Sequence, residues 1–163
     1  MREAQRGSSS ALGELYGAHW RRAHRAAFLI VHDSAAAEDI AQDGFLAAID
    51  ALDRFDRRRP FAPWLHRIVA NRAIDWARRE TLRRRLDGET EPPPASVSDG
   101  LGEDVMGALA ALPAEQRAVV VLRHLLEYTP GEIATMLELP RGTVNSRLRR
   151  ALDSLGARLE WQR

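Results

Sequence analysis

The chain has 163 residues, a formal net charge of +1 and no cysteine, so it has neither disulfides nor thiolate metal sites. Its five histidines show no ligand-like pairing with one another, and we expect no metal and no cofactor. No apolar run approaches the roughly 20 residues needed to cross a bilayer, and the first residues lack the apolar core of a signal peptide. We therefore expect a cytoplasmic protein without membrane insertion.

The composition and the placement of charge predict a helical chain in two parts. Alanine, leucine, arginine and glutamate dominate, and no long stretch of strict apolar alternation occurs. Residues 54–85 hold eleven arginines against three acids, whereas residues 86–105 hold six acids and no base. Two basic surfaces therefore flank an acidic connector.

The N-terminal half predicts three helices that bury one modest core. The first two are expected over about 11–31 and 35–52, with Asp33 and Ser34 ending the first helix and capping the second. The third has Pro63 in its first turn and runs to about residue 86. The exposed face of the second helix is acidic, and its members are Glu38, Asp39, Gln42 and Asp43.

The third helix and the segment before it are rich in polar groups. Residues 54–60 form a basic loop that contains Arg57, Arg58 and Arg59. A polar stripe at spacings of four, four and three then follows one side of the helix, and it consists of Arg67, Asn71, Asp75 and Arg78.

Beyond the third helix the helical pattern ends in glycine, proline and acidic residues, which predicts a flexible acidic linker. Two more helices are expected over 105–112 and 114–126. We therefore predict an all-α protein of two small helical domains: a three-helix bundle over residues 1–86, a linker over 87–103, and a four-helix domain over 104–163.

Residues 128–150 predict a helix-turn-helix. Thr129, Pro130 and Glu132 form the reciprocal cap that starts a helix, and Pro140 opens a second one. The second helix carries an inward apolar stripe of Val144, Leu148, Leu152 and Leu155. Its other face carries donors suited to base edges or phosphates, namely Arg141, Asn145, Ser146, Arg149 and Arg150. The competing interpretation is an ordinary helical hairpin with a solvated basic face.

Taken together, four motifs resemble those of a bacterial RNA polymerase sigma factor of the extracytoplasmic-function (ECF) group. In region two of that family an acidic box ends in Gln-Glu-x-Phe, and a Phe-x-x-Trp-Leu pattern follows. In this chain the region-two matches are residues 36–45 (AAEDIAQDGF) and 61–75 (FAPWLHRIVANRAID), and the region-four matches are residues 112–122 (LPAEQRAVVVL) and 140–148 (PRGTVNSRL). The chain departs from the family pattern at Asp43, Gly44 and Val69, and at Glu138, where the turn commonly has glycine.

The resemblance implies a transcription initiation factor that binds core RNA polymerase and directs it to specific promoters. It implies that Glu38, Asp39, Gln42 and Asp43 contact the polymerase. It also implies which residues contact DNA. Those that contact the melted −10 element, including its unpaired non-template strand, are Arg57, Arg58, Arg59, Trp64, Arg67, Asn71, Asp75 and Arg78. Those that contact the duplex −35 element are Arg141, Thr143, Asn145, Ser146, Arg147, Arg149 and Arg150. An anti-sigma factor is a further candidate partner.

Two points stay open at the level of sequence. Trp64 either wedges against the last base pair or belongs to the core. The main functional alternative is a helix-turn-helix regulator that does not depend on core polymerase, and a decoy that sequesters an inhibitor is a third class. An enzyme is the least favoured class, because no nucleophile with a base, no carboxylate pair and no phosphate-cradling glycine loop is visible, so no catalytic residue is expected.

Overall fold

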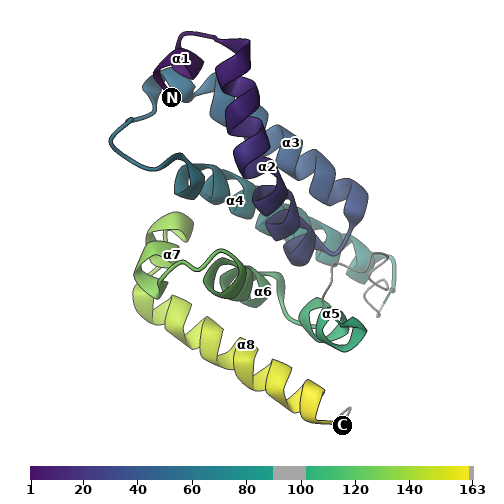
Figure 1. The fold of residues 1–163 in the computed structure, drawn as a ribbon. Coiled ribbons are helices and arrows are strands. Elements are labelled where there is room, and N and C mark those ends of the chain that lie inside the picture. The colour runs from purple at the N-terminus through teal and green to yellow at the C-terminus, as the bar shows by residue number, and fades with distance from the viewer. Residues whose placement is uncertain (90–101, 162–163) are drawn as a thin grey trace.

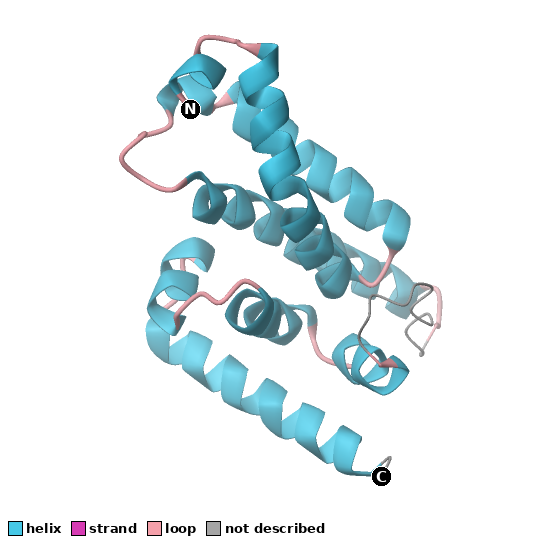
Figure 2. Cartoon of the chain, viewed as in Figure 1, coloured by secondary structure: helices cyan, strands magenta, loops and turns pink. Residues whose placement is uncertain are grey.

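The computed structural model describes residues 1–89 and 102–161, with side chains described through residue 159. These ranges contain helices and no β-strand, which confirms the all-α class (Figure 2). Most of the predicted acidic linker, residues 90–101, lies outside them. The elements are α1 (Arg2–Gln5), α2 (Ser9–Val31), α3 (Ser34–Asp50), the 3-10 turn η1 (Leu52–Arg54), α4 (Phe61–Leu86), α5 (Glu103–Ala110), α6 (Ala114–Val120), the π-helical turn η2 (Val121–Leu125), α7 (Pro130–Leu137) and α8 (Arg141–Trp161).

The helix starts follow from short polar side chains that accept otherwise unpaired backbone N–H groups. Ser8 accepts from the amide of Ala11 at 3.3 Å, and Asp33 accepts from that of Ala36 at 2.8 Å. Thr129 and Glu132 form the predicted reciprocal cap of α7. The Ser8 cap explains why α2 begins at Ser9, two residues before the expected start.

The helices form two layers (Figure 1). Helices α2, α3 and α4 pack on one another, while α8 packs on α5, α6 and α7. Helix α4 also contacts α6 and α7, so the second group of helices lies against the first. In Figure 1, α5, α6 and α7 lie between α4 and α8.

The apolar core runs through both groups of helices. Leu65 and Val69 of α4, Leu122 of η2 and Ile133 of α7 are all at most 1% exposed and belong to one contiguous cluster. The hydrophobic effect scales with the apolar area removed from water. The apolar side chains buried between the two groups of helices therefore hold the two layers together.

Two local details differ from the expectations. The helix expected over residues 114–126 is present over 114–125, but residues 121–125 have π-helical instead of α-helical hydrogen bonds. On α8 the buried positions are Val144, Leu148 and Ala151, and Leu152 is 47% exposed. The small Ala151 sits at the close contact, so the inward stripe runs at spacings of four and three and leaves Leu152 outside.

Two departures from the sigma-factor pattern explain each other. Gly44 of α3 faces Val69 of α4, and a Cβ added at Gly44 would lie 2.6 Å from Val69 Cγ2. Val69 is only 1% exposed, and a valine side chain has one strongly preferred χ1 rotamer in a helix. Glycine at position 44 therefore makes room for the larger residue at position 69.

We expect Gly44→Ala to lower the free energy of unfolding by about 1 kcal/mol. Overpacking costs roughly 1 to 3 kcal/mol, and the better helix propensity of alanine recovers only about 1 kcal/mol of it. In a Val69→Ala background the same change should instead stabilise the protein, because the clash is gone. Urea unfolding of the four variants measures both effects, and the same sign in both backgrounds would contradict this packing explanation.

Candidate nucleic-acid and partner interfaces

The second helix of the predicted helix-turn-helix, α8, presents its basic face to solvent. Val144 and Leu148 anchor the helix, and the opposite side carries Arg141, Asn145 and Arg149 at spacings of four, with Arg150 beside them. All four are exposed. A helix held by one face and lined with donors on the other has the geometry that reads base edges in a major groove.

Three other residues predicted for this face are half-buried. The Ser146 hydroxyl donates to the Thr143 carbonyl at 3.0 Å, so it is engaged by its own helix. Arg147 lies near the buried stripe, where its charge acts on Glu115 of α6. Ser146 and Arg147 are therefore better placed to stabilise the helix than to contact bases directly.

The acidic face of α3 is exposed at all four predicted positions. Gln42 donates to the Glu38 carboxylate at 3.3 Å, one helical turn away. Leu46 continues this face and is 59% exposed, which sequence reasoning did not single out. Its signal was available, because Leu46 follows Gln42 by four residues and therefore shares its side of the helix.

The loop between η1 and α4 is anchored at its start and presents arginines at its tip. Phe55 is buried and stacks on Trp64, with ring centroids 4.7 Å apart. The Asp56 carboxylate accepts from the Arg58 backbone amide and guanidinium, at 3.0 Å each. Arg57 and Arg59 are exposed. The loop thus offers basic groups on a folded base.

Trp64 belongs to this aromatic cluster. Besides stacking on Phe55, it contacts Phe61 edge-on at 5.8 Å, and it is half-buried. The side chain is thus held in the cluster and is also partly exposed.

The polar stripe of α4 lies against the C-terminal helices. Arg67 forms an ion pair with Glu138, and Asn71 donates to the Met136 carbonyl at 3.4 Å. Farther along, Arg78 forms an ion pair with Glu115 and lies 3.9 Å from Asp75. Three residues predicted to hold DNA are therefore engaged by α6, by α7 and by the turn before α8.

The ion pair with Arg67 explains why the turn has glutamate at position 138 where the family commonly has glycine. Glu138 ends α7 in the left-handed conformation, with φ of 54°, where glycine would be less strained. Its carboxylate makes the contact with Arg67 that glycine could not make.

A buried histidine and a buried tyrosine also join the two layers. His66 Nδ1 and the Tyr128 hydroxyl are 2.7 Å apart, and both side chains are at most 9% exposed. Burial, with smaller contributions from the charges of His19 and Arg22, lowers the pKa of His66 to about 4. Burial raises the pKa of Tyr128 to about 12. Both groups are therefore uncharged near pH 7.

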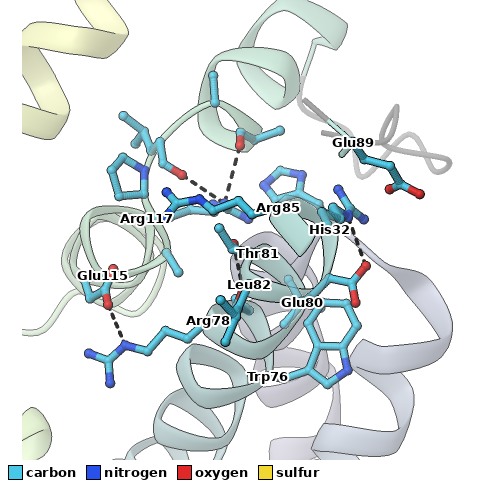
Figure 3. A pocket seen from close by; sticks show the side chains of 18 of the residues that line it. His32, Trp76, Arg78, Glu80, Thr81, Leu82, Arg85, Glu89, Glu115 and Arg117 are labelled. Carbon is cyan, nitrogen blue, oxygen red and sulfur yellow. Dashed lines mark hydrogen bonds and ion pairs between the residues drawn. The ribbon is translucent and has the colours of Figure 1, made fainter. Parts of the chain in front are cut away.

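A second set of polar groups borders an open cavity of about 900 Å³ between α4 and the α5–α6 turn (Figure 3). Arg117 of α6 donates to the Ile30 carbonyl of α2 and, at 2.9 Å, to the Leu112 carbonyl. His32 lies nearby and is 4% exposed, and burial and the charge of Arg117 lower its pKa to about 4. Arg117 thus ties the end of α2 to the C-terminal helices.

Across residues 1–89 and 102–161, no cluster of three or more histidine, cysteine or acidic residues has the arrangement of a metal site. Within the same described part of the chain, no helix is long and apolar enough to cross a membrane.

The fold and these surfaces define a class: a helical protein with a basic helix-turn-helix and a separate, exposed acidic face on another helix. Residues 15–83 match the family described as Sigma-70 region 2, and residues 102–155 match that described as Sigma-70, region 4. The chain belongs to the sigma-70 family and, within it, to the ECF group. It is therefore a transcription initiation factor that directs RNA polymerase to promoters, and the alternative of a polymerase-independent regulator is not favoured.

Similar proteins span nearly the whole chain. ECF sigma factor SigW of Bacillus subtilis is 29% identical, covering 98% of this chain and 94% of its own. SigM of Mycobacterium tuberculosis is 36% identical, and the match covers 89% of this chain and 75% of SigM. CnrH, solved in complex with the cytosolic domain of CnrY, is 31% identical and has a TM-score of 0.74. That match covers 99% of this chain and 96% of CnrH.

Proposed function

We propose that three surfaces of this chain carry out the work of a sigma factor. The α3 face of Glu38, Asp39, Gln42 and Asp43 docks on basic groups of core polymerase. The α8 face reads the −35 element, and the loop before α4, with the α4 stripe, holds the melted −10 strand. Docking and −10 binding fall in the domain of residues 1–86, and −35 reading falls in the domain of residues 104–163.

The observation that carries this proposal is the simultaneous exposure of the acidic α3 face and the basic α8 face. They lie on opposite layers of the molecule, so a partner on one does not cover the other (Figure 1). Oppositely charged faces suit two different partners, a basic protein surface and a polyanionic duplex.

The test is run-off transcription with purified core polymerase on a library of promoter fragments. We expect transcripts from a restricted set of fragments only when the protein is added. Transcription that starts at the same fragments without the protein, or from none with it, would contradict the proposal.

The interdomain contacts add a step to this function. Arg67, Asn71 and Arg78 contact the C-terminal helices here, so they reach DNA only after the two domains separate. We propose that docking on the polymerase holds the domains apart. An anti-sigma factor would act in the opposite sense by holding this chain off the polymerase. The similar protein CnrH has been solved in complex with the cytosolic domain of CnrY.

At the −35 element we expect Asn145→Ala and Arg149→Ala to change sequence preference. Each bidentate contact with a base is worth roughly 1 to 3 kcal/mol of discrimination. Arg147→Ala should weaken binding evenly across sequences, with a smaller salt slope if this residue contacts a phosphate. Selection of bound duplexes from a randomised −35 pool measures preference. Identical profiles for the wild type and the Asn145 variant would remove that residue from the reading face.

A further inference from the structure

Gln5 connects the first helix to the start of the basic loop. Its side-chain amide donates to the Leu52 carbonyl at 2.8 Å and to the Phe55 carbonyl at 3.0 Å. It ends α1, which lies outside the matched region 15–83. Ala4, beside it, is 4% exposed and belongs to the core cluster, so α1 is packed in place.

The two carbonyls mark the point where the chain leaves the bundle. Leu52 begins η1, and Phe55 follows its end with extended backbone. The Leu52 carbonyl also accepts the Phe55 backbone amide at 3.1 Å, and its second lone pair is free for the Gln5 amide. One side-chain amide with two N–H donors thus bonds to the first residue of the turn and to the residue that follows it. Gln5 thereby fixes the backbone on either side of η1.

This anchor sets the direction in which the loop departs. The Phe55 ring stacks on Trp64 and meets Phe61 edge-on at 5.9 Å, so its side chain and its carbonyl are both held. The next residue, Asp56, accepts from Arg58 and folds the loop over itself. The positions of Arg57 and Arg59 therefore depend on a base that Gln5 restrains.

We infer that Gln5 is a positioning residue for binding of the −10 element, and that α1 holds the base of the loop of residues 56–60 in place. The inference rests on the proposed function of that loop. Gln5 makes no contact with DNA in this scheme. It holds the loop in the one orientation in which its arginines and Trp64 face the melted strand, which lowers the ordering cost of binding that strand.

The test uses holoenzyme made with full-length variants. Gln5→Glu keeps the size of the side chain but removes both donors and places a carboxylate against two carbonyls. Gln5→Lys restores a donor at the same place. Glu3→Gln is the matched control, because it changes an exposed residue of the same helix by the same chemical group.

Three measurements separate positioning from general destabilisation. They are the affinity for a fork template with an unpaired −10 strand, discrimination among −10 sequences on that template, and permanganate reactivity of unpaired thymines at a promoter. Core affinity and −35 duplex binding are recorded for the same proteins.

We expect Gln5→Glu to lower fork affinity and promoter opening about tenfold, with weaker discrimination at −10, since two hydrogen bonds to the loop base are lost. Core affinity and −35 binding should stay at wild-type levels, and Gln5→Lys should recover most of the loss.

Wild-type opening and discrimination by Gln5→Glu would overturn the inference. So would an equal loss of core affinity, which would show a structural role only. Failure of the wild type itself to support promoter-specific transcription would overturn the proposed function instead.

Discussion

Replacing Glu38 and Asp39 by arginine is expected to abolish core-polymerase binding and leave the fold intact. Both residues are exposed on α3 beyond its first turn, so the change breaks no core contact. It shifts the face by four charges, from negative to positive. Like charges placed against each other in an interface cost several kcal/mol, and 1.4 kcal/mol is tenfold, so affinity should fall at least about a hundredfold.

The measurement is retention of core polymerase on the immobilised variant, with titration to obtain affinities. A control with the same change in charge is Glu3→Arg with Glu14→Arg, since both residues are exposed acids of the same domain and lie outside α3. The control should bind polymerase within a few fold of the wild type. Wild-type retention by the Glu38 and Asp39 variant would leave the acidic face as a merely solvated surface.

Features set by local chemistry were predictable from the sequence. The caps at Asp33 and at Thr129 are short-range hydrogen bonds, and both are confirmed. The stripe of Val144 and Leu148 follows from helical periodicity, and it is also confirmed. The motifs indicated the family, which the comparisons confirm.

Features set by contacts between distant segments were not predictable. An arginine and an asparagine on a helix suit DNA and a neighbouring domain equally well, so the sequence alone did not reveal that Arg67 and Asn71 contact the C-terminal helices. Gln5 carried no signal, because its partners are backbone carbonyls 47 and 50 residues away. The roles of the predicted interface residues stay predictions.

Acid should destabilise this protein through two buried histidines. His32 and His66 are each 4% exposed, and burial lowers the pKa of each to about 4 from an ordinary value of 6.5. Below pH 6.5 the unfolded chain binds more protons than the folded one, so stability falls as the pH falls. The loss is complete once the pH passes below 4, and it amounts to about 3 kcal/mol for each histidine.

For His66 the same linkage acts on the contact between the domains. Its burial depends on Tyr128 of the C-terminal domain, so separation of the domains would expose the ring and raise its pKa towards the ordinary value. Protonation therefore favours the separated arrangement, with His19 and Arg22 adding repulsion. The carboxyl of Glu115 stays ionised through most of this range: burial alone would raise its pKa, but the hydrogen bond from Arg78 lowers it.

The chain has no cysteine, so cysteines introduced at the exposed positions Asp50 and Asp153 can carry a pair of dyes that report the distance between the domains. We expect energy transfer to fall between pH 6.5 and pH 4, before global unfolding seen by circular dichroism.

His66→Gln keeps a polar side chain that can bond to Tyr128 but cannot be protonated, so energy transfer in this variant should stay constant over this range. His32→Gln should keep the wild-type change in transfer and lose part of the pH dependence of unfolding. An equal response in the wild type and in His66→Gln would show that another group controls the contact. A difference confined to His66 would establish that the surface covering the α4 stripe opens by protonation of one buried ring.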